Sequence, residues 1–220
     1  MFRKYEKTYR ILINQIKIKG KHFLSDSDTS RLLNGNVVVT EKIDGANVGI
    51  IKHKDNFRLQ KRGSLVDFGE HFQFNYFKAW SEINREKLLK IPNNMVLYGE
   101  WMVCTHTIVY DKLPDYFLAF ALYDKTADEY KHRDEMTKLC DDMGLYYTPE
   151  IARGVFTKDE LFKMIPAQST FGPTKAEGIV VWNYTADLRG KIVREEFVKD
   201  MEEDEHWSSK TITKNKLLKK

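Results

Sequence analysis

Two β-prone runs on either side of a turn signal constrain the fold of this chain more than any other feature. Residues 37–43 read Val-Val-Val-Thr-Glu-Lys-Ile and residues 47–51 read Asn-Val-Gly-Ile-Ile, with Asp44-Gly45-Ala46 between them. β-Branched residues favour extended strands, and an Asp-Gly pair favours the tight turn of a hairpin. The sequence therefore predicts a hairpin that carries Lys42 near its bend.

Further runs rich in β-branched and aromatic residues predict strands at residues 57–61, 95–102, 116–123, 178–182 and 190–197. Helices are predicted at residues 74–83, at residues 136–143 before Gly144, and after the capping-box pair Thr157 and Glu160. We interpret the aromatic stripe in the first of these helices as core packing rather than as a surface on which bases stack. The fold class is therefore α+β, a largely antiparallel β core with flanking helices.

Length and composition indicate a single domain. The 220 residues are 42% hydrophobic, enough for a sizeable core, and neither an internal repeat nor a linker divides them. We expect one domain over residues 1–220, with a basic segment at 1–30 and a charged tail at 200–220. The first 22 residues hold the acid Glu6 and seven basic residues: Arg3, Lys4, Lys7, Arg10, Lys17, Lys19 and Lys21. Such flanks suit a phosphate backbone, and equally suit solvated ends that keep a protein soluble.

Several classes of protein are excluded. Cys104 and Cys140 are the only cysteines, which rules out a disulfide framework and a zinc site built from cysteines. No stretch approaches the roughly 18 apolar residues of a membrane span, and the start lacks the apolar core of a secretory signal. We expect an intracellular, cytoplasmic protein with no membrane partner. Residues 172–175 read Gly-Pro-Thr-Lys and lack the Gly-Lys-Ser/Thr pattern of a P-loop.

The tetrapeptide Lys42-Ile43-Asp44-Gly45 is a candidate site for covalent chemistry. A lysine at a strand end beside a tight turn can present its amine to a pocket. An ammonium is no nucleophile, so such chemistry needs nearby cations or a metal-bound phosphate that favour the neutral amine. On its own, the tetrapeptide is more typical of a hairpin with a solvated lysine.

Two carboxylates interrupt apolar strands. Glu100 lies between Tyr98-Gly99 and Trp101, and Glu177 directly precedes the apolar strand predicted at residues 178–182. Burying an unpaired charge is costly, so each needs a polar partner. Read singly, each is more typical of a salt bridge or of a solvated strand end.

Cations and one aromatic ring complete the set of candidates. Residues 189–194 read Arg-Gly-Lys-Ile-Val-Arg, and period-two geometry should send Arg189 and Lys191 to one face and Arg194 to the other. Two cations on one face suit a phosphate. Arg62 stands beside a glycine, where its forked donors suit a phosphate as well, and Phe120 could offer its ring to a flat base.

Taken in order, Lys42 with its Asp-Gly, Arg62, Glu100, Phe120, Glu177 and Lys191 form a pattern. It resembles the RNA ligase branch of the covalent nucleotidyltransferase superfamily, which also contains DNA ligases and mRNA capping enzymes. The resemblance extends from about residue 35 to the end of the chain. Its most specific part is residues 41–47, with Glu before the lysine and Asn five residues after it. It implies a ligase-type nucleotidyltransferase domain of ATP-grasp-like architecture.

The resemblance implies roles around the nucleoside. Lys42 would be the nucleophile that takes AMP from ATP, and Glu41 would hydrogen-bond the adenine amino group. Asn47 would lie near the ribose or the phosphates, Glu100 would receive the ribose hydroxyls, and Phe120 would stack on adenine.

It also implies roles around the phosphates. Arg62 and Lys191 would contact them, and Glu177 would organise Mg²⁺ or Mn²⁺, through water. The family often has two lysines separated by one residue at the position of Lys191. In this sequence, either Arg189 replaces the first of these lysines or the second lysine is missing. Residues Glu205-His206-Trp207-Ser208 also resemble the end of small RNA ligases, but this match is less specific than the match at residues 41–47.

The implied function is ATP-dependent RNA ligation: a lysyl-AMP forms, AMP passes to an RNA 5′-phosphate, and that end joins a 3′-hydroxyl. DNA ligases and capping enzymes normally continue into an OB-fold domain, and the 26 residues after Arg194 are too few for one. A DNA ligase, a capping guanylyltransferase core and a nonenzymatic nucleic-acid-binding module stay open as alternatives.

Overall fold

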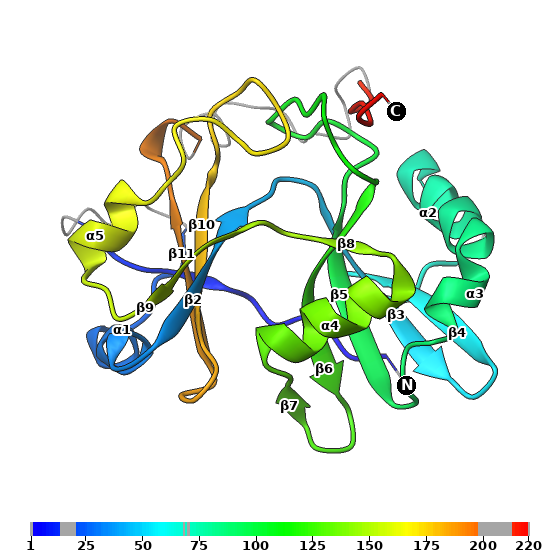
Figure 1. Ribbon diagram of the computed structural model, residues 1–220, viewed down its shortest axis with the longest axis horizontal. Helices are drawn as coiled ribbons and strands as arrows, with labels where there is room; N and C mark the ends of the chain where they lie inside the picture. Colours follow the sequence, from blue (N-terminus) through cyan, green and yellow to red (C-terminus); the bar gives the residue numbers. More distant parts are fainter. Residues whose placement is uncertain (1, 14–20, 68, 70, 198–212, 220) are drawn as a thin grey trace.

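The computed structural model describes residues 2–13, 21–67, 69, 71–197 and 213–219. Within these ranges the strands form two sheets that lie side by side (Figure 1). The first sheet has the order β1-β11-β10-β2-β9, and the second has the order β4-β3-β5-β6-β7 with β8 also paired to β6. The pairs β1–β11 and β6–β8 are parallel and the other pairs are antiparallel, which confirms the predicted α+β class.

The strands of the first sheet are β1 (Tyr9–Arg10), β2 (Val37–Lys42), β9 (Glu150–Gly154), β10 (Gly178–Asn183) and β11 (Leu188–Val193). Those of the second sheet are β3 (Ala46–His53), β4 (Asn56–Lys61), β5 (Met95–Trp101), β6 (Phe117–Asp124), β7 (Glu129–Tyr130) and β8 (Tyr146–Tyr147). The helices are α1 (Asp26–Leu33), α2 (Phe72–Ile83), α3 (Arg85–Leu88), α4 (Arg133–Met143) and α5 (Lys158–Lys163).

The predicted helices formed for the reasons given by the sequence. Helix α4 ends at Gly144, whose φ of 63° is the left-handed conformation that glycine adopts most readily. Helix α5 begins with the predicted capping box, in which Thr157 and Glu160 each hydrogen-bond the other's backbone N–H. Phe77 of α2 is fully buried, as expected for core packing.

The predicted hairpin is wrong. Strand β2 pairs with β9 and β10, whereas β3 pairs with β4 and β5, so the two runs belong to different sheets. The linking Asp44 explains why. Its carboxylate accepts hydrogen bonds from the backbone N–H groups of Thr107 and Ile108, and its own N–H donates to the Tyr110 hydroxyl at 2.9 Å. These contacts hold the chain where it crosses from one sheet to the other.

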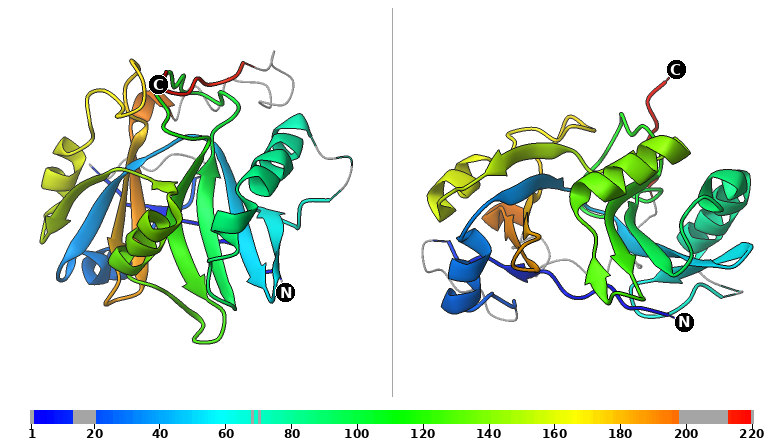
Figure 2. Two further views of the ribbon diagram at one scale, coloured as in Figure 1. Left: turned by 45° about the vertical axis from the view of Figure 1, so that its right-hand side comes forward. Right: turned by 60° about the horizontal axis from the view of Figure 1, so that its bottom comes forward.

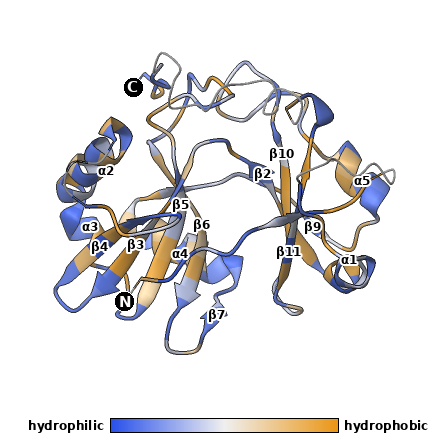
Figure 3. Ribbon diagram, turned by 180° about the vertical axis from the view of Figure 1, so that it is seen from behind, coloured by the Kyte–Doolittle hydropathy of each residue, from blue (hydrophilic) through white to orange (hydrophobic). Residues whose placement is uncertain are grey.

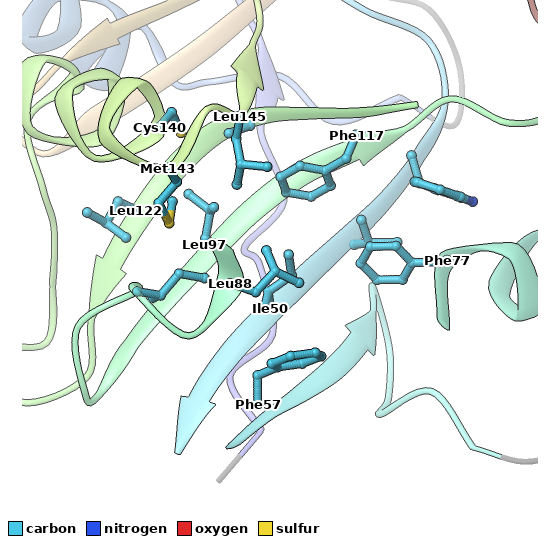
Figure 4. Close-up of a cluster of buried hydrophobic side chains, with 14 of the residues drawn as sticks. Ile50, Phe57, Phe77, Leu88, Leu97, Phe117, Leu122, Cys140, Met143 and Leu145 are labelled. Atoms are coloured by element: carbon cyan, nitrogen blue, oxygen red, sulfur yellow. The ribbon is translucent and has the colours of Figure 1, made fainter. Parts of the chain in front are cut away.

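One face of the second sheet packs against α2, α3 and α4. Figure 4 shows this cluster, in which Phe77, Leu88 and Met143 of the helices meet Ile50 and other side chains of the strands. In Figure 3 the central strands of both sheets are coloured mostly as hydrophobic, which fits their burial. None of the helices within the described ranges is long and apolar enough to cross a membrane.

The N-terminal segment is part of the fold rather than a free basic arm. It runs across both sheets (Figure 2). The Arg3 carbonyl accepts hydrogen bonds from the Tyr98 hydroxyl and the Gln60 amide, Tyr5 is buried, and β1 joins the first sheet. Lys17 and Lys19 lie outside the described residues.

Residues 213–219, the described part of the predicted charged tail, also dock on the protein. The Asn215 amide donates to the carbonyls of Met102 and Cys104, and its oxygen accepts from the Tyr110 N–H at 3.0 Å. The tail motif at residues 205–208 lies outside the described residues.

Candidate active site

A cavity of about 170 Å³ is lined by residues from both sheets and from the N-terminal segment. Seven of the nine predicted site residues line it: Glu41, Lys42, Asn47, Arg62, Glu100, Phe120 and Lys191. The eighth, Glu177, contacts Lys42 directly. The ninth, Arg189, does not line the cavity but packs against the ring of Trp182, which does.

Lys42 and Glu177 form the centre of the site. Lys42 ends β2 and faces Gly178 of β10 in the antiparallel register, which brings the preceding Glu177 beside it. Lys42 Nζ lies 2.6 Å from Glu177 Oε2, and the Glu177 side chain is only 2% exposed. The polar partner that the sequence required for Glu177 is therefore Lys42.

Three carboxylates set the protonation of Lys42. Burial lowers the pKa of its amine, but Glu177, Asp44 and Glu100 together outweigh burial and raise the pKa above its ordinary value. Burial raises the pKa of Glu177, and Lys42 opposes that shift. The protein's own groups thus hold Lys42 as an ammonium, and its use as a nucleophile requires that this proton be removed.

Glu100 has the polar partner that its place in an apolar strand required. Its Oε1 accepts a hydrogen bond from the Gly45 N–H at 3.0 Å. Position 45 has room for glycine but not for a larger residue, because a Cβ there would lie 2.6 Å from Met102 Sδ and 2.8 Å from the Trp101 carbonyl oxygen. Burial raises the pKa of Glu100 to about 7, while Lys42 opposes the shift.

Cations gather beside the Lys42–Glu177 pair. Burial lowers the pKa of Lys191 to about 8, and the positive charges of Lys42, Arg10 and Arg62 add to the shift. Arg10 was not among the predicted site residues. It lies opposite Lys191 in the parallel β1–β11 pairing, so only the tertiary fold reveals it. This concentration of positive charge suits a phosphate group.

Two other arginines of this region lie away from the cavity. The Arg189 guanidinium lies 4.6 Å from the ring centres of Tyr5 and Tyr130 and 5.0 Å from that of Trp182. Arg194 points to the opposite face, as predicted, and donates to the carbonyls of Ile165, Pro166 and Ala176. Of the basic residues near the end of β11, Lys191 is the one that lines the cavity.

The position of the Glu41 carboxylate contradicts the role implied for it. Glu41 alternates with Lys42 along β2 and shares the face of its partner Ile179, which packs in the core of the first sheet. Its carboxylate accepts hydrogen bonds from Ser169 Oγ at 2.6 Å and from the Thr170 N–H at 3.1 Å. The side chain is therefore engaged on the side of the sheet opposite Lys42, and it is not placed to bind a base in the cavity.

Aromatic side chains also line the cavity. Phe120 lines it and packs edge-on against Tyr5, with ring centres 5.0 Å apart. Trp182 and Tyr184 stack on each other at 4.9 Å. Trp182 lies on the strand that follows Glu177, at the spacing that shares a face with Val180, so period-two alternation could have found it. Tyr5 carries no such signal in the sequence.

Within the described ranges, no group of three or more His, Cys, Asp or Glu side chains is placed to hold a metal ion by itself. The cavity does offer Glu177 beside a cluster of cations. A single carboxylate together with phosphate oxygens and water is the usual way in which proteins hold Mg²⁺. The site therefore fits a divalent ion that arrives with a phosphorylated ligand.

Comparisons with solved structures give the same fold. A lysine-to-alanine variant of the Naegleria gruberi RNA ligase with ATP and Mn superposes with a TM-score of 0.63 at 19% identity, covering 75% of this chain and 51% of that one. The same ligase with pyrophosphate gives a TM-score of 0.68 at 17% identity, covering 92% of this chain and 59% of that one. The chain thus spans a little over half the length of these ligase structures.

No curated protein sequence matches the chain. The model of the family described as RNA ligase matches residues 35–193, the stretch that holds all nine predicted site residues. Since this match covers well over half of the 220 residues, the chain belongs to the RNA ligase family.

Proposed function

We propose that this protein is an ATP-dependent RNA ligase that forms a lysyl-AMP at Lys42, transfers AMP to an RNA 5′-phosphate and joins that end to a 3′-hydroxyl. The observation that carries the proposal is the buried pair of Lys42 and Glu177 in a cavity with Lys191 and Arg62. The Naegleria gruberi ligase has been solved with ATP and Mn and with AMP and Mn, which supports ATP and a divalent metal as its partners here.

In the first step Lys42 must lose its proton. Glu177 Oε2, at 2.6 Å, is placed to accept it, and burial makes this carboxylate more basic. The neutral nitrogen then bonds to the α-phosphorus while the bond from phosphorus to the bridging oxygen breaks, and pyrophosphate leaves with the electron pair. Lys191 and Arg62 offset the negative charge of the phosphates.

Mg²⁺ or Mn²⁺ supplies further charge neutralisation at phosphorus when bound, and Glu177 is the carboxylate that would hold it through water. Phe120 stacks on adenine, Glu100 receives the ribose hydroxyls, and Asn47 lies near the ribose or the phosphates. Asn47 Oδ1 is buried and has no hydrogen-bond partner among the residues that the structure describes, which supports a ligand contact there. Since the cavity draws its walls from both sheets, we propose that they act as one nucleotidyltransferase domain.

Label transfer tests the first step. The protein is incubated with α-labelled ATP and Mg²⁺, denatured and examined for bound label. The proposal expects label on the wild type and none on Lys42→Ala or Lys42→Arg, because the guanidinium of the second variant keeps the charge but is no nucleophile. Labelling of both variants would refute the role of Lys42, and transfer from GTP in place of ATP would favour a capping enzyme.

A panel of nicked substrates tests the joining step. A 5′-phosphate and a 3′-hydroxyl are presented at a nick in duplex RNA, at the same nick in duplex DNA, and on single-stranded RNA. The proposal expects RNA ends to be sealed, an activity typical of RNA repair, and expects Lys42→Ala to seal none of them. Efficient sealing of the all-DNA nick alone would identify a DNA ligase.

A further inference from the structure

The chain crosses between the two sheets a second time at Thr148 and Pro149, between β8 and β9 (Figure 1). The Thr148 N–H donates to the carbonyl of Ala119, next to Phe120, at 2.9 Å. The Pro149 carbonyl accepts from the N–H of Glu41, next to Lys42, also at 2.9 Å. The segment is therefore tied to the strand that carries the proposed stacking ring and to the strand that carries the proposed nucleophile.

Arg133 fixes this segment further. Its Nη2 donates to the Thr148 carbonyl at 2.5 Å and its Nε to Glu150 Oε2 at 2.9 Å. The Arg133 side chain is 2% exposed. Both backbone hydrogen-bonding groups of Thr148 are thus satisfied.

The side chain of Thr148 is different. Thr148 lines the cavity and is only 4% exposed, yet its Oγ1 has no hydrogen-bond partner among the residues that the structure describes. Native proteins leave few buried polar atoms unpaired, because each one costs folding free energy. An unpaired hydroxyl in the wall of a binding cavity can hydrogen-bond a polar group of the ligand.

The Glu41 carboxylate is engaged elsewhere and does not serve a base in the cavity. The resemblance assigned the adenine amino group to Glu41, but that carboxylate is held by Ser169 and Thr170 on the other face of the sheet. A polar base edge buried in the cavity still requires hydrogen bonds. Thr148 offers a hydroxyl that can both donate and accept, on the segment bonded to the strand of Phe120.

We propose that the Thr148 hydroxyl hydrogen-bonds the outer edge of the adenine base, at its 6-amino group, N1 or N7, and is a binding residue for ATP. This inference rests on the proposed function, in that it takes ATP as the nucleotide in the cavity. It assigns the base contact to a residue outside the motifs that the sequence pattern singled out.

The test uses Thr148→Val, which keeps the branched shape and removes the hydroxyl, with Thr148→Ser as the matched control that retains it. In the label-transfer assay Thr148→Val should raise the KM for ATP by about 3- to 10-fold, the worth of one neutral hydrogen bond, with little change in kcat. Thr148→Ser should stay close to the wild type. An unchanged KM in Thr148→Val would overturn the proposal.

Nucleotide analogues identify the contact. The triphosphates of purine riboside, 1-deazaadenosine and 7-deazaadenosine lack the 6-amino group, N1 and N7 respectively. The difference between Thr148→Val and the wild type should vanish with the analogue that lacks the bonded group. A difference of the same size with ATP and with all three analogues would overturn the proposal.

Two further measurements distinguish a lost base contact from a loss of protein stability and from a failure of the proposed chemistry. The melting temperature of Thr148→Val without nucleotide should equal or exceed that of the wild type, because an unpaired hydroxyl is removed; a large decrease would assign Thr148 a structural role and overturn the inference. If the wild type takes no label, the proposed chemistry fails. Equilibrium binding of ATP to the wild type and Thr148→Val then tests the base contact independently, with the same 3- to 10-fold change expected.

Discussion

Lys42 Nζ and Glu177 Oε2 lie 2.6 Å apart although the two residues are 135 positions apart in the sequence. The antiparallel pairing of β2 with β10 creates this contact, because Lys42 stands opposite Gly178. The proposed nucleophile thus shares its proton with a buried carboxylate. Charge in the cavity therefore sets the protonation of Lys42.

Glu177→Gln keeps the shape of the side chain and removes its charge. The pKa of Lys42 should fall, since the strongest attraction on its ammonium is lost, and competitive acetylation across a pH series should detect this. Label transfer should nevertheless decrease by about 100-fold or more, because the proton acceptor is gone. Glu196→Gln, which breaks the exposed pair with Lys175, is the matched control and should change neither property. Full activity in Glu177→Gln would contradict the proton transfer.

Lys191 should shape the pH dependence of label transfer. The proportion of neutral Lys42 rises with pH, so log kcat/KM should rise with unit slope. Above about pH 8 Lys191 loses the charge that binds phosphate, and the profile should level off. Lys191→Arg keeps its charge at any such pH, so its profile should continue to rise. A plateau at the same pH in the variant would show that Lys191 is not the group responsible.

Glu100 should make stability depend on pH. Burial raises the pKa of its carboxyl from 4.5 to about 7. The folded state therefore favours the protonated acid, and the stability that this contributes is present below pH 4.5 and is lost as pH rises through 7. Glu100→Gln should raise the melting temperature by roughly 3–6 °C at pH 8.5 and have little effect at pH 4.5. The same change at both pH values would contradict this account.

Phe120 should contribute to nucleotide binding rather than to the chemical step. Stacking on a base is worth about 1–3 kcal/mol, so Phe120→Ala should raise the KM for ATP by about 5- to 100-fold with little loss of kcat. Phe120→Tyr retains the ring and serves as the control. Tyr5 packs against Phe120, so a substitution at Phe120 can also change stability. A melting curve should therefore be recorded for each Phe120 variant. A loss confined to kcat would assign Phe120 a different role.

Much of the local structure could be predicted because its causes are local. The Thr157–Glu160 capping box and the left-handed Gly144 act within a few residues, and both are present. The order of Lys42, Glu100 and Glu177 indicated one site through the resemblance to RNA ligases, and the two carboxylates in apolar strands required polar partners. Their partners, Gly45 and Lys42, are found in the fold.

The features of the fold and the site that the sequence did not predict depend on contacts between distant segments. The sequence favoured a hairpin around Asp44, but the loop at Thr107 to Tyr110 binds Asp44 and sends the next strand into another sheet. The Glu41 carboxylate is held by Ser169 and Thr170, which lie 128 and 129 positions further along the chain. The contribution of Arg10 arises from β1 pairing with β11, which no periodicity near the N-terminus indicates.

The most direct test of the account is the site of covalent attachment. The wild-type protein is incubated with ATP and Mg²⁺, digested with protease, and the peptides are examined by mass spectrometry under conditions that preserve an acid-labile phosphorus–nitrogen bond. The account predicts one AMP on the peptide that contains Lys42, attached at Lys42 itself. AMP found on another residue, or no AMP on a folded protein that binds ATP, would contradict it.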